Sequence, residues 1–274
     1  MIFDYAILNG TLQPADQIQI SLFHKAALSG FGVYEAIKVD RGRPFYFEEH
    51  VRRLQQSAAM LELGLDVDET VLASWFDQLV ALEPQATWRL TMIVYGAAEA
   101  DDPPLIALRP EPLATYPDRF YHEGAAATLY AGQRALPACK SLNSLVNFLA
   151  RRAATRAGTL EGLLHHAGFI TEGARSNLFA VRQGQLITPP ARDVLSGITR
   201  DIVVQLMQQT DHPVTERSIS TNLAEVDELF ITSTSMHVMP ITRVDGRPIG
   251  AGQVGPVTKL AAARFEAHYR AVMG

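Results

Sequence analysis

Cysteine is almost absent from the 274-residue sequence, which contains a single one, Cys139. One cysteine cannot form an intrachain disulfide, and this fits a reducing compartment. The first residues lack the basic and long apolar regions of a signal peptide. No run reaches the roughly 18 apolar residues of a membrane-spanning helix. We therefore expect a cytoplasmic protein without a membrane partner.

Positive charge is also scarce, because 24 lysines and arginines face 29 aspartates and glutamates, for a net charge of −5. Such a surface lacks the broad cationic footprint of a nucleic-acid-binding protein, so we expect no nucleic-acid partner. Apolar residues make up 47% of the chain, which excludes wholesale disorder and allows a sizeable core. These values indicate an α/β or α+β protein, a class in which enzymes are common.

Several catalytic and metal-binding motifs are missing. There is no His-Glu-x-x-His and no cysteine pair, and the adjacent His165 and His166 would face opposite sides of a strand. We therefore expect no metal site. The chain has no Walker loop and no Gly-x-Ser-x-Gly elbow. Without an obvious histidine partner, Cys139 is interpreted as a packed thiol.

Hydrophobic periodicity predicts alternating strands and helices, with a hairpin turn at Asn9-Gly10. Strands are expected over residues 33–39, 45–47, 87–95, 105–108, 126–130, 162–166, 178–181, 185–187 and 228–232. Helices are expected over residues 47–63, 68–82, 144–158, 199–209 and 257–272. Prolines cluster near the middle of the chain and disfavour both element types. We therefore place a linker at 114–124, between a small N-terminal α/β domain (1–113) and a larger C-terminal domain (125–274).

Two charged residues are candidates for catalytic chemistry. Lys140 lies in an apolar, strand-like stretch, where its ammonium form is disfavoured, so it is a candidate Schiff-base nucleophile. The alternative is a lysine with a packed stem and a solvated amine. Glu172 lies in an apparent turn of small residues, and the alternative there is a solvated glutamate.

Three further features could bind a phosphate. Gly197 and Thr199 stand at the start of a predicted helix, where free backbone N–H groups attract anions. The hydroxyls of Ser233-Thr234-Ser235 follow a predicted strand. Arg52 and Arg53 are neighbours on a helix, so one can face inward while the other is solvated. Each feature has an ordinary alternative, namely a helix cap, a turn or a surface arginine. Together with Lys140 and Glu172 they match the needs of pyridoxal 5′-phosphate (PLP), which requires a Schiff-base lysine, a partner for its ring nitrogen and a phosphate cup.

A series of longer motifs supports this interpretation. The motifs are Gly32-Val33-Tyr34-Glu35-Ala36-Ile37-Lys38-Val39, Glu49-His50-Val51-Arg52-Arg53-Leu54, Lys140-Ser141-Leu142-Asn143, Ile170-Thr171-Glu172-Gly173, Ser176-Asn177-Leu178-Phe179, Gly197-Ile198-Thr199-Arg200, Asp227-Glu228-Leu229-Phe230 and Thr232-Ser233-Thr234-Ser235. With them the chain resembles the class IV (fold-type IV) PLP aminotransferases almost from end to end.

The resemblance implies a small N-terminal α/β domain, a larger C-terminal pseudo-barrel α/β domain with PLP between them, and a homodimer whose active site lies near the subunit interface. It also implies the site roles. Lys140 would hold PLP and act as the catalytic base, and Glu172 would pair with the ring nitrogen. The phosphate ligands would be Arg53, the amides of Ile198 and Thr199, and the Thr234 hydroxyl. Leu195 would pack on the ring, and Tyr34 would line the substrate pocket.

Substrate choice within the family is less constrained. The stretch 33–39 looks most like the D-amino acid transaminases, although bacillary members bind the substrate carboxylate with an Arg-x-His that is here Val94-Tyr95-Gly96-Ala97. Arg175 is the candidate replacement, because it follows Glu172 in the same segment, and Lys38 and Lys25 are runners-up. Ser235 is a further candidate for substrate binding. The alternatives are a branched-chain L-amino acid transaminase, an aminodeoxychorismate lyase, an (R)-amine transaminase and a non-catalytic PLP-binding protein.

Overall fold

The computed structural model describes residues 1–97 and 102–274, which form two compact units. The first unit contains Met1–Ala114 together with Cys139–Asn143. The second contains Thr115–Ala138 and Ser144–Val272. Within the described ranges, no helix is long and apolar enough to cross a membrane.

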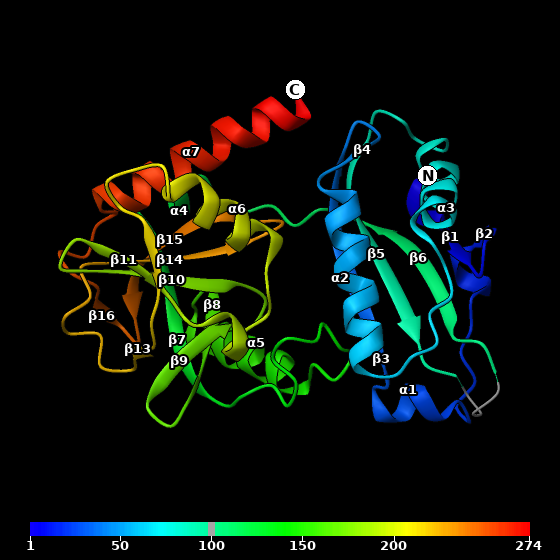
Figure 1. Ribbon diagram of the computed structural model, residues 1–274, viewed down its shortest axis with the longest axis horizontal. Coiled ribbons are helices and arrows are strands. Elements are labelled where there is room, and N and C mark those ends of the chain that lie inside the picture. Colours follow the sequence, from blue (N-terminus) through cyan, green and yellow to red (C-terminus); the bar gives the residue numbers. More distant parts are fainter. Residues whose placement is uncertain (98–101) are drawn as a thin grey trace. The chain divides into compact units, whose positions relative to one another are not determined.

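The first unit is built on a six-stranded antiparallel sheet in the order β2-β1-β6-β5-β3-β4 (Figure 1). Its strands are β1 (Tyr5–Leu8), β2 (Thr11–Pro14), β3 (Gly32–Asp40), β4 (Arg43–Pro44), β5 (Thr87–Tyr95) and β6 (Leu105–Glu111). The predicted hairpin at Asn9-Gly10 is confirmed, since both residues have the positive φ that such a turn needs. Strand β5 matches the prediction because its side chains alternate between polar and apolar.

Helices cover this sheet and supply part of its core. They are η1 (Ile2–Asp4), η2 (Ala15–Gln17), α1 (Lys25–Ser29), α2 (Phe47–Met60) and α3 (Glu69–Val80). Figure 1 shows α2 lying along the sheet, and Val51 and Leu54 of this helix are fully buried. From α3, Phe76 stacks on Trp88 of β5 with 5.9 Å between ring centroids. The returning strand expected over residues 45–47 is wrong, because β4 ends at Pro44 and the helix begins at Phe47, although the N–H of Phe45 still donates to the Lys38 carbonyl of β3 at 2.8 Å.

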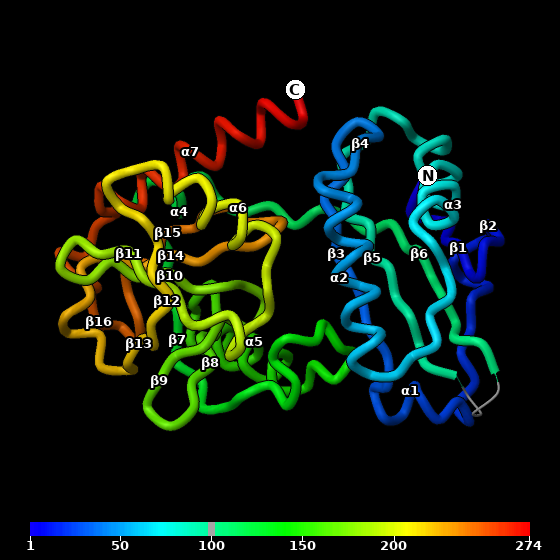
Figure 2. Tube along the Cα trace, in the orientation of Figure 1, coloured from blue at the N-terminus to red at the C-terminus, as the bar shows by residue number. Residues whose placement is uncertain are grey.

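The second unit is built on a ten-stranded mixed sheet in the order β12-β11-β10-β14-β15-β7-β8-β9-β13, with β16 paired to β15. Its strands are β7 (Ala125–Ala131), β8 (Glu161–His166), β9 (Phe169–Gly173), β10 (Asn177–Arg182), β11 (Gln185–Thr188), β12 (Val214–Glu216), β13 (Ile219–Ser220), β14 (Glu228–Ser233), β15 (His237–Val244) and β16 (Arg247–Pro248). Figure 2 shows β10, β14 and β15 side by side, although a long stretch of chain separates β10 from β14. Phe179 and Phe230 are opposite each other in β10 and β14 and stack at 4.8 Å in the core.

Four helices and one 3-10 turn complete the second unit. They are α4 (Arg119–His122), α5 (Leu145–Ala157), η3 (Ala191–Asp193), α6 (Ile198–Met207) and α7 (Pro256–Met273). Helix α5 ends as predicted at Gly158, whose φ of 68° suits glycine. Helix α4 falls within the segment expected to be a linker.

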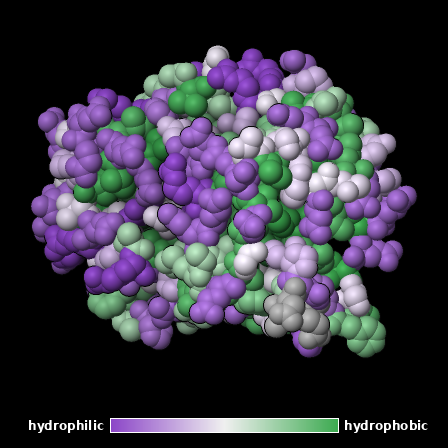
Figure 3. Space-filling view, turned by 45° about the vertical axis from the view of Figure 1, so that its right-hand side comes forward, coloured by the Kyte–Doolittle hydropathy of each residue, from purple (hydrophilic) through white to green (hydrophobic). Residues whose placement is uncertain are grey.

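Apolar side chains also reach the surface among hydrophilic ones, as the face in Figure 3 shows. In the first unit, Leu22, Phe23 and Leu28 are 98%, 93% and 91% exposed. In the second unit, Leu145 and Phe148 of α5 are 66% and 55% exposed. Exposure this large at neighbouring apolar residues is typical of an interaction surface.

Candidate active site

The candidate residues fall into two groups, one in each unit. In the first unit, Lys140 lies in a loop rather than in the expected strand, and only its neighbour Ser141 forms a bridge, to Val33 of β3. The backbone N–H of Lys140 donates to Ser57 Oγ at 3.1 Å, and its carbonyl accepts from the N–H of Tyr34 at 3.0 Å. The loop is therefore fixed on both sides of Lys140. Cys139 beside it is buried, as expected of a packed thiol.

The amine of Lys140 lies over an aromatic ring. Its Nζ is 4.6 Å from the centroid of the Tyr34 ring. Among residues 1–97 and 102–274, no carboxylate pairs with this amine and no hydrogen bond holds it. A lysine that must react with a carbonyl group needs an amine without a carboxylate partner, and Lys140 meets that need.

Strand β3 presents different residues to its two faces. Tyr34, Ala36 and Lys38 alternate with the fully buried Val33, Glu35 and Ile37. A charged residue in the buried row must have partners, since an unpaired buried charge is costly. Glu35 finds them on α2.

Glu35 binds Arg53 and His50 at the same time. Its Oε1 accepts from Arg53 Nε, and its Oε2 accepts from Arg53 Nη2, each at 2.7 Å. Its Oε2 also lies 2.7 Å from His50 Nδ1. Since an ionised carboxylate can only accept, Nδ1 of His50 is the donor. Nε2 of the same ring is then a buried acceptor, and no group in the described part of the chain bonds to it.

Burial and charge act against each other in this cluster. Burial alone would raise the pKa of Glu35, but Arg53 and His50 outweigh burial and hold the pKa of this carboxyl well below its usual range. Burial lowers the pKa of His50 even though Glu35 acts in the opposite direction. At neutral pH the cluster is therefore an anionic Glu35, a cationic Arg53 and a neutral His50. Arg53 is buried and Arg52 exposed, which confirms that the two face different ways.

In the second unit, Glu172 is on strand β9 and not in the turn expected from its small neighbours, which begins at Ala174. Its side chain is 7% exposed. Its Oε1 accepts from Arg134 Nε at 2.6 Å, and its Oε2 accepts from the N–H of Leu195 at 3.3 Å. The carboxylate is thus held from two sides.

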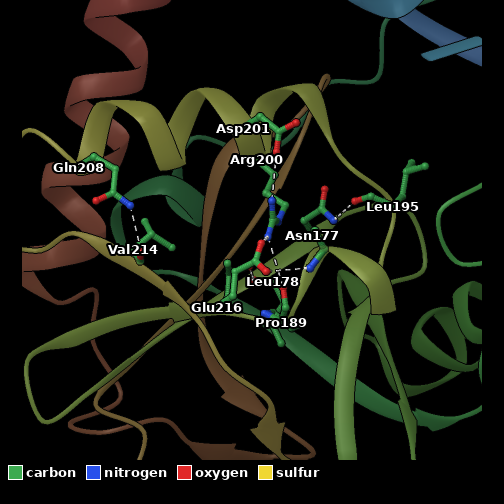
Figure 4. A network of polar contacts seen from close by, with 11 residues as sticks. Asn177, Leu178, Pro189, Leu195, Arg200, Asp201, Gln208, Val214 and Glu216 are labelled. Atoms are coloured by element: carbon green, nitrogen blue, oxygen red, sulfur yellow. Dashed lines mark hydrogen bonds and ion pairs between the residues drawn. The ribbon is translucent and has the colours of Figure 1, made fainter. Parts of the chain in front are cut away.

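At the start of α6, the side chain of Asn177 lies against Gly197. A Cβ on Gly197 would overlap Oδ1 of Asn177, so a larger residue would have to displace this amide or the start of the helix. Asn177 Nδ2 donates to the carbonyl of Leu195 at 2.7 Å (Figure 4). One turn into the helix, the buried Arg200 donates to Glu216 at 2.8 Å, which ties α6 to β12. The first N–H groups of α6, those of Ile198 and Thr199, have no partner within a helix and are available to an anion.

Beside this helix, β14 ends in the turn that carries Thr234 and Ser235. Thr232 is opposite Asn177 in the sheet, so the two side chains share a face. The hydroxyl of Thr232 is buried and finds no hydrogen-bond partner within the residues that the structure describes. Ser235 Oγ is 3.2 Å from the hydroxyl of Tyr116.

Arg175 follows in the turn after β9. Its Nε is 3.7 Å from Oε2 of the fully buried Glu161, and its guanidinium carbon is 5.7 Å from the centroid of the Tyr116 ring. Burial raises the pKa of Glu161, despite Arg175 and the hydrogen bonds from Ser176 and Gly162.

The structure divides the predicted site residues between the two units. Tyr34 and Lys140 are in contact in one unit, where Arg53 is paired with Glu35 and Lys38 lies on the same strand face as Tyr34. In the other unit, Glu172 contacts Leu195. Lys25 begins α1 in the first unit. The residues that sequence reasoning misses are Glu35, His50, Arg134, Glu161 and Tyr116. Two sequence signals could have indicated the Glu35 cluster. His50 and Arg53 are three residues apart on a helix, and Glu35 lies in an otherwise apolar row of a strand.

The side chains of both groups fit PLP. Lys140 offers an amine without a carboxylate partner, Glu172 a buried carboxylate, and the α6 start a cradle that a Cβ would fill. The orphaned hydroxyl of Thr232 is a further donor close to that cradle. Among the described residues, no group of three or more His, Cys, Asp or Glu side chains is arranged to hold a metal ion.

Two kinds of named aminotransferase are similar to this chain in sequence. The chain is 32% identical to a D-alanine aminotransferase of Bacillus licheniformis over 262 residues, which cover 92% of this chain and 93% of the relative. It is 31% identical to a putative branched-chain-amino-acid aminotransferase of Methanocaldococcus jannaschii, with 94% of each chain covered. The sequence is therefore similar to enzymes of both substrate classes.

Solved structures confirm the fold. The branched-chain amino acid aminotransferase of Escherichia coli superimposes with a TM-score of 0.88 and 27% identity, covering 96% of this chain and 94% of that one. A branched-chain enzyme from T.th., solved with pyridoxamine 5′-phosphate, gives 0.87 and 26%, with 96% and 92% covered. The expected fold-type IV α/β architecture is confirmed. A family model described as amino-transferase class IV matches residues 32–244, and the chain belongs to this family.

Proposed function

We propose that this class IV aminotransferase is a PLP-dependent transaminase that moves the amino group of a D-amino acid to a 2-oxo acid in a ping-pong cycle. The observation that carries the proposal is the setting of Lys140. Its backbone is fixed by Ser57 and Tyr34, and its amine lies 4.6 Å above the Tyr34 ring with no carboxylate partner in the described chain.

PLP, when bound, supplies an electron sink and carries the amino group between the two substrates. Lys140 would hold the cofactor and, once displaced by the substrate amine, take the proton from the substrate Cα and return it. Glu172 would accept a hydrogen bond from the protonated ring nitrogen. Because Arg134 and the Leu195 N–H already fix this carboxylate, little reorganisation is needed.

The phosphate would be held by charge and by backbone donors. Arg53 brings a guanidinium whose Nε and Nη2 are fixed by Glu35. The N–H groups of Ile198 and Thr199 and the hydroxyl of Thr234 would complete the cup. Leu195 would pack on the ring. These assignments require that both units act on one cofactor.

The substrate residues are proposed on similar grounds. Tyr34 and Lys38 share a face of β3, on which Tyr34 also contacts Lys140. Arg175 and Ser235 belong to the second unit and both lie close to Tyr116. We assign the substrate α-carboxylate to Arg175, because a guanidinium binds a carboxylate in two parallel hydrogen bonds.

D-amino acids are favoured by the similarity to D-alanine aminotransferases at 29% to 32% identity. A branched-chain L-amino acid transaminase is the second candidate, and the M. jannaschii relative and the solved neighbours favour it. A homodimer is proposed because Leu22, Phe23 and Leu28 are almost fully exposed.

The test is a half-reaction without acceptor. The PLP form is mixed separately with D-alanine, D-glutamate, L-leucine and (R)-1-phenylethylamine, and the absorbance of the cofactor is followed. Conversion to the aminated form by the D-amino acids alone is the expected result. Conversion by L-leucine alone would assign the branched-chain class, and conversion by the amine alone the (R)-amine class. An unchanged cofactor absorbance with all four compounds, together with pyruvate formation from aminodeoxychorismate, would indicate the lyase.

A further inference from the structure

Tyr116 lies between two residues that are far apart in the sequence. Its hydroxyl is 3.2 Å from Ser235 Oγ, 119 residues away along the chain. The face of its ring lies 5.7 Å from the guanidinium carbon of Arg175. All three residues belong to the second unit. One side chain therefore connects the turn after β9 with the turn after β14.

The guanidinium of Arg175 retains its capacity to donate. Its ion pair with Glu161 is 3.7 Å long, beyond hydrogen-bond distance. In the described part of the chain, no acceptor forms a hydrogen bond with it, and the side chain is 34% exposed. The five N–H donors of this planar group suit an incoming carboxylate.

Glu161 is the charged side chain next to Arg175. It is fully buried, and its carboxylate accepts from Ser176 Oγ at 3.1 Å and from the N–H of Gly162 at 3.0 Å. These bonds hold the carboxylate 3.7 Å from Nε of Arg175, so it attracts the guanidinium without accepting a hydrogen bond from it. The Tyr116 ring supplies the second contact, since an arginine is attracted to an aromatic face.

We propose that Tyr116 is a positioning residue for substrate specificity, which seats Arg175 against its ring and orients the Ser235 hydroxyl so that the two bind the α-carboxylate of the substrate. This proposal rests on the proposed function. The guanidinium, the Tyr116 hydroxyl and the Ser235 hydroxyl can all donate hydrogen bonds, as the recognition of an anion requires. An amine substrate without a carboxylate would gain nothing from them.

The test compares Tyr116→Leu, which removes ring and hydroxyl, with Tyr116→Phe, which removes the hydroxyl alone. We expect Tyr116→Leu to raise KM for D-alanine about tenfold with kcat changed less than twofold, and Tyr116→Phe to raise KM about threefold. The affinity of the apoprotein for PLP should be unchanged, because Tyr116 touches none of its proposed ligands. Tyr121→Phe, a nearby tyrosine in α4, is the matched control and should leave KM as in the wild type.

A binding measurement separates this proposal from the proposed function. Propionate, an unreactive monocarboxylate, is titrated into the PLP form of each variant while the cofactor spectrum is followed. The expected result is a Kd about tenfold weaker in Tyr116→Leu than in the wild type, even if no amino acid is transaminated. An unchanged Kd and an unchanged KM in Tyr116→Leu would overturn the role of Tyr116. A fall in kcat or in PLP affinity with KM unchanged would overturn it as well.

Discussion

Charge pairing within the chain determines how the site side chains are held. Arg53 and Glu172, the proposed ligands of the phosphate and of the ring nitrogen, are each fixed by an oppositely charged side chain of their own unit, Glu35 for the first and Arg134 for the second. Such buried pairs contribute little to stability when intact, but removing one partner is costly because the other charge stays buried. Under the proposed function, these pairs would set the direction of each side chain before PLP binds.

Glu35→Gln tests this role for the phosphate ligand. The amide keeps the shape of the carboxylate but removes the negative charge that Arg53 and His50 face at this position. We expect the unfolding free energy to fall by about 3–5 kcal/mol and the Kd of the apoprotein for PLP to weaken at least tenfold. Chemical denaturation and PLP titration measure the two effects. Glu48→Gln on the exposed face of α2 is the control, and a Glu35→Gln protein that binds PLP like this control would contradict the assignment.

The pH dependence of stability follows from His50. Burial lowers its pKa in the folded state below the usual value of 6.5, so the unfolded chain binds the proton more readily. The contribution of neutral His50 to the unfolding free energy is therefore complete above pH 6.5. It decreases as pH falls below 6.5, by at most about 1.4 kcal/mol per pH unit. In His50→Asn, which keeps an N–H for Glu35, we expect a smaller loss of Tm between about pH 7 and pH 5. His122→Asn, at an exposed histidine, should lose Tm as the wild type does; equal curves for all three proteins would refute the prediction.

At the scale of elements, the junction of β10, β14 and α6 shapes the proposed phosphate cup. Asn177 begins β10, Thr232 lies opposite it in β14, and Gly197 precedes α6 where a Cβ would overlap the Asn177 amide. The three residues are distant in sequence, so the cradle exists only when the strands are paired in this register.

Gly197→Ala tests the fit of this junction. The added methyl would overlap Asn177 Oδ1 and must push either the amide or the start of the helix aside. We expect a loss of about 1–3 kcal/mol in unfolding free energy and a PLP affinity reduced about tenfold. Gly64→Ala is the matched control, because a Cβ there meets nothing within 4 Å. An alanine at position 197 that leaves both quantities unchanged would show that the cradle is not the anion site.

Elements with a regular local pattern can be predicted, and those defined by distant partners cannot. Strand β5 and helix α5 follow directly from alternation and from Gly158. Strand β15 contains Pro240, and a proline argues against a central strand because it has no N–H to donate. The pairing of β15 with β7 begins only at Ile241, so no hydrogen bond to β7 is lost at Pro240. The glycine and alanine that follow Glu172 favour a turn, and the pairing of β9 with β8 and β13 overrides that preference.

The same distinction applies to the site. Lys140, Glu172 and Arg53 can be proposed as site residues from the sequence because their motifs are local. Arg134 and Tyr116 cannot, because their contacts join residues 38 and 119 positions apart. No local pattern records a contact of that kind.

At the scale of the whole molecule, the exposed apolar side chains predict self-association. Leu22, Phe23 and Leu28 are each more than 90% exposed, and large exposed apolar side chains close together in the chain are typical of an interaction surface. We expect light scattering to give about twice the chain mass of 30.1 kDa. The double variant Phe23→Ser/Leu28→Ser should shift the protein toward one chain mass, whereas Met60→Ser, at another exposed apolar residue, should not. A wild type that stays monomeric at high micromolar concentration would contradict the dimer.

The central claim is that Lys140 carries PLP. The chain has only four lysines, at positions 25, 38, 140 and 259, so the attachment point can be determined without ambiguity. The measurement is borohydride reduction of the PLP-loaded protein, which leaves the cofactor covalently attached to the amine that holds it, followed by peptide mapping by mass spectrometry. The account predicts that the pyridoxyl group is found on Lys140 alone. A label on Lys25, Lys38 or Lys259 instead, or a protein that takes up no PLP, would contradict it.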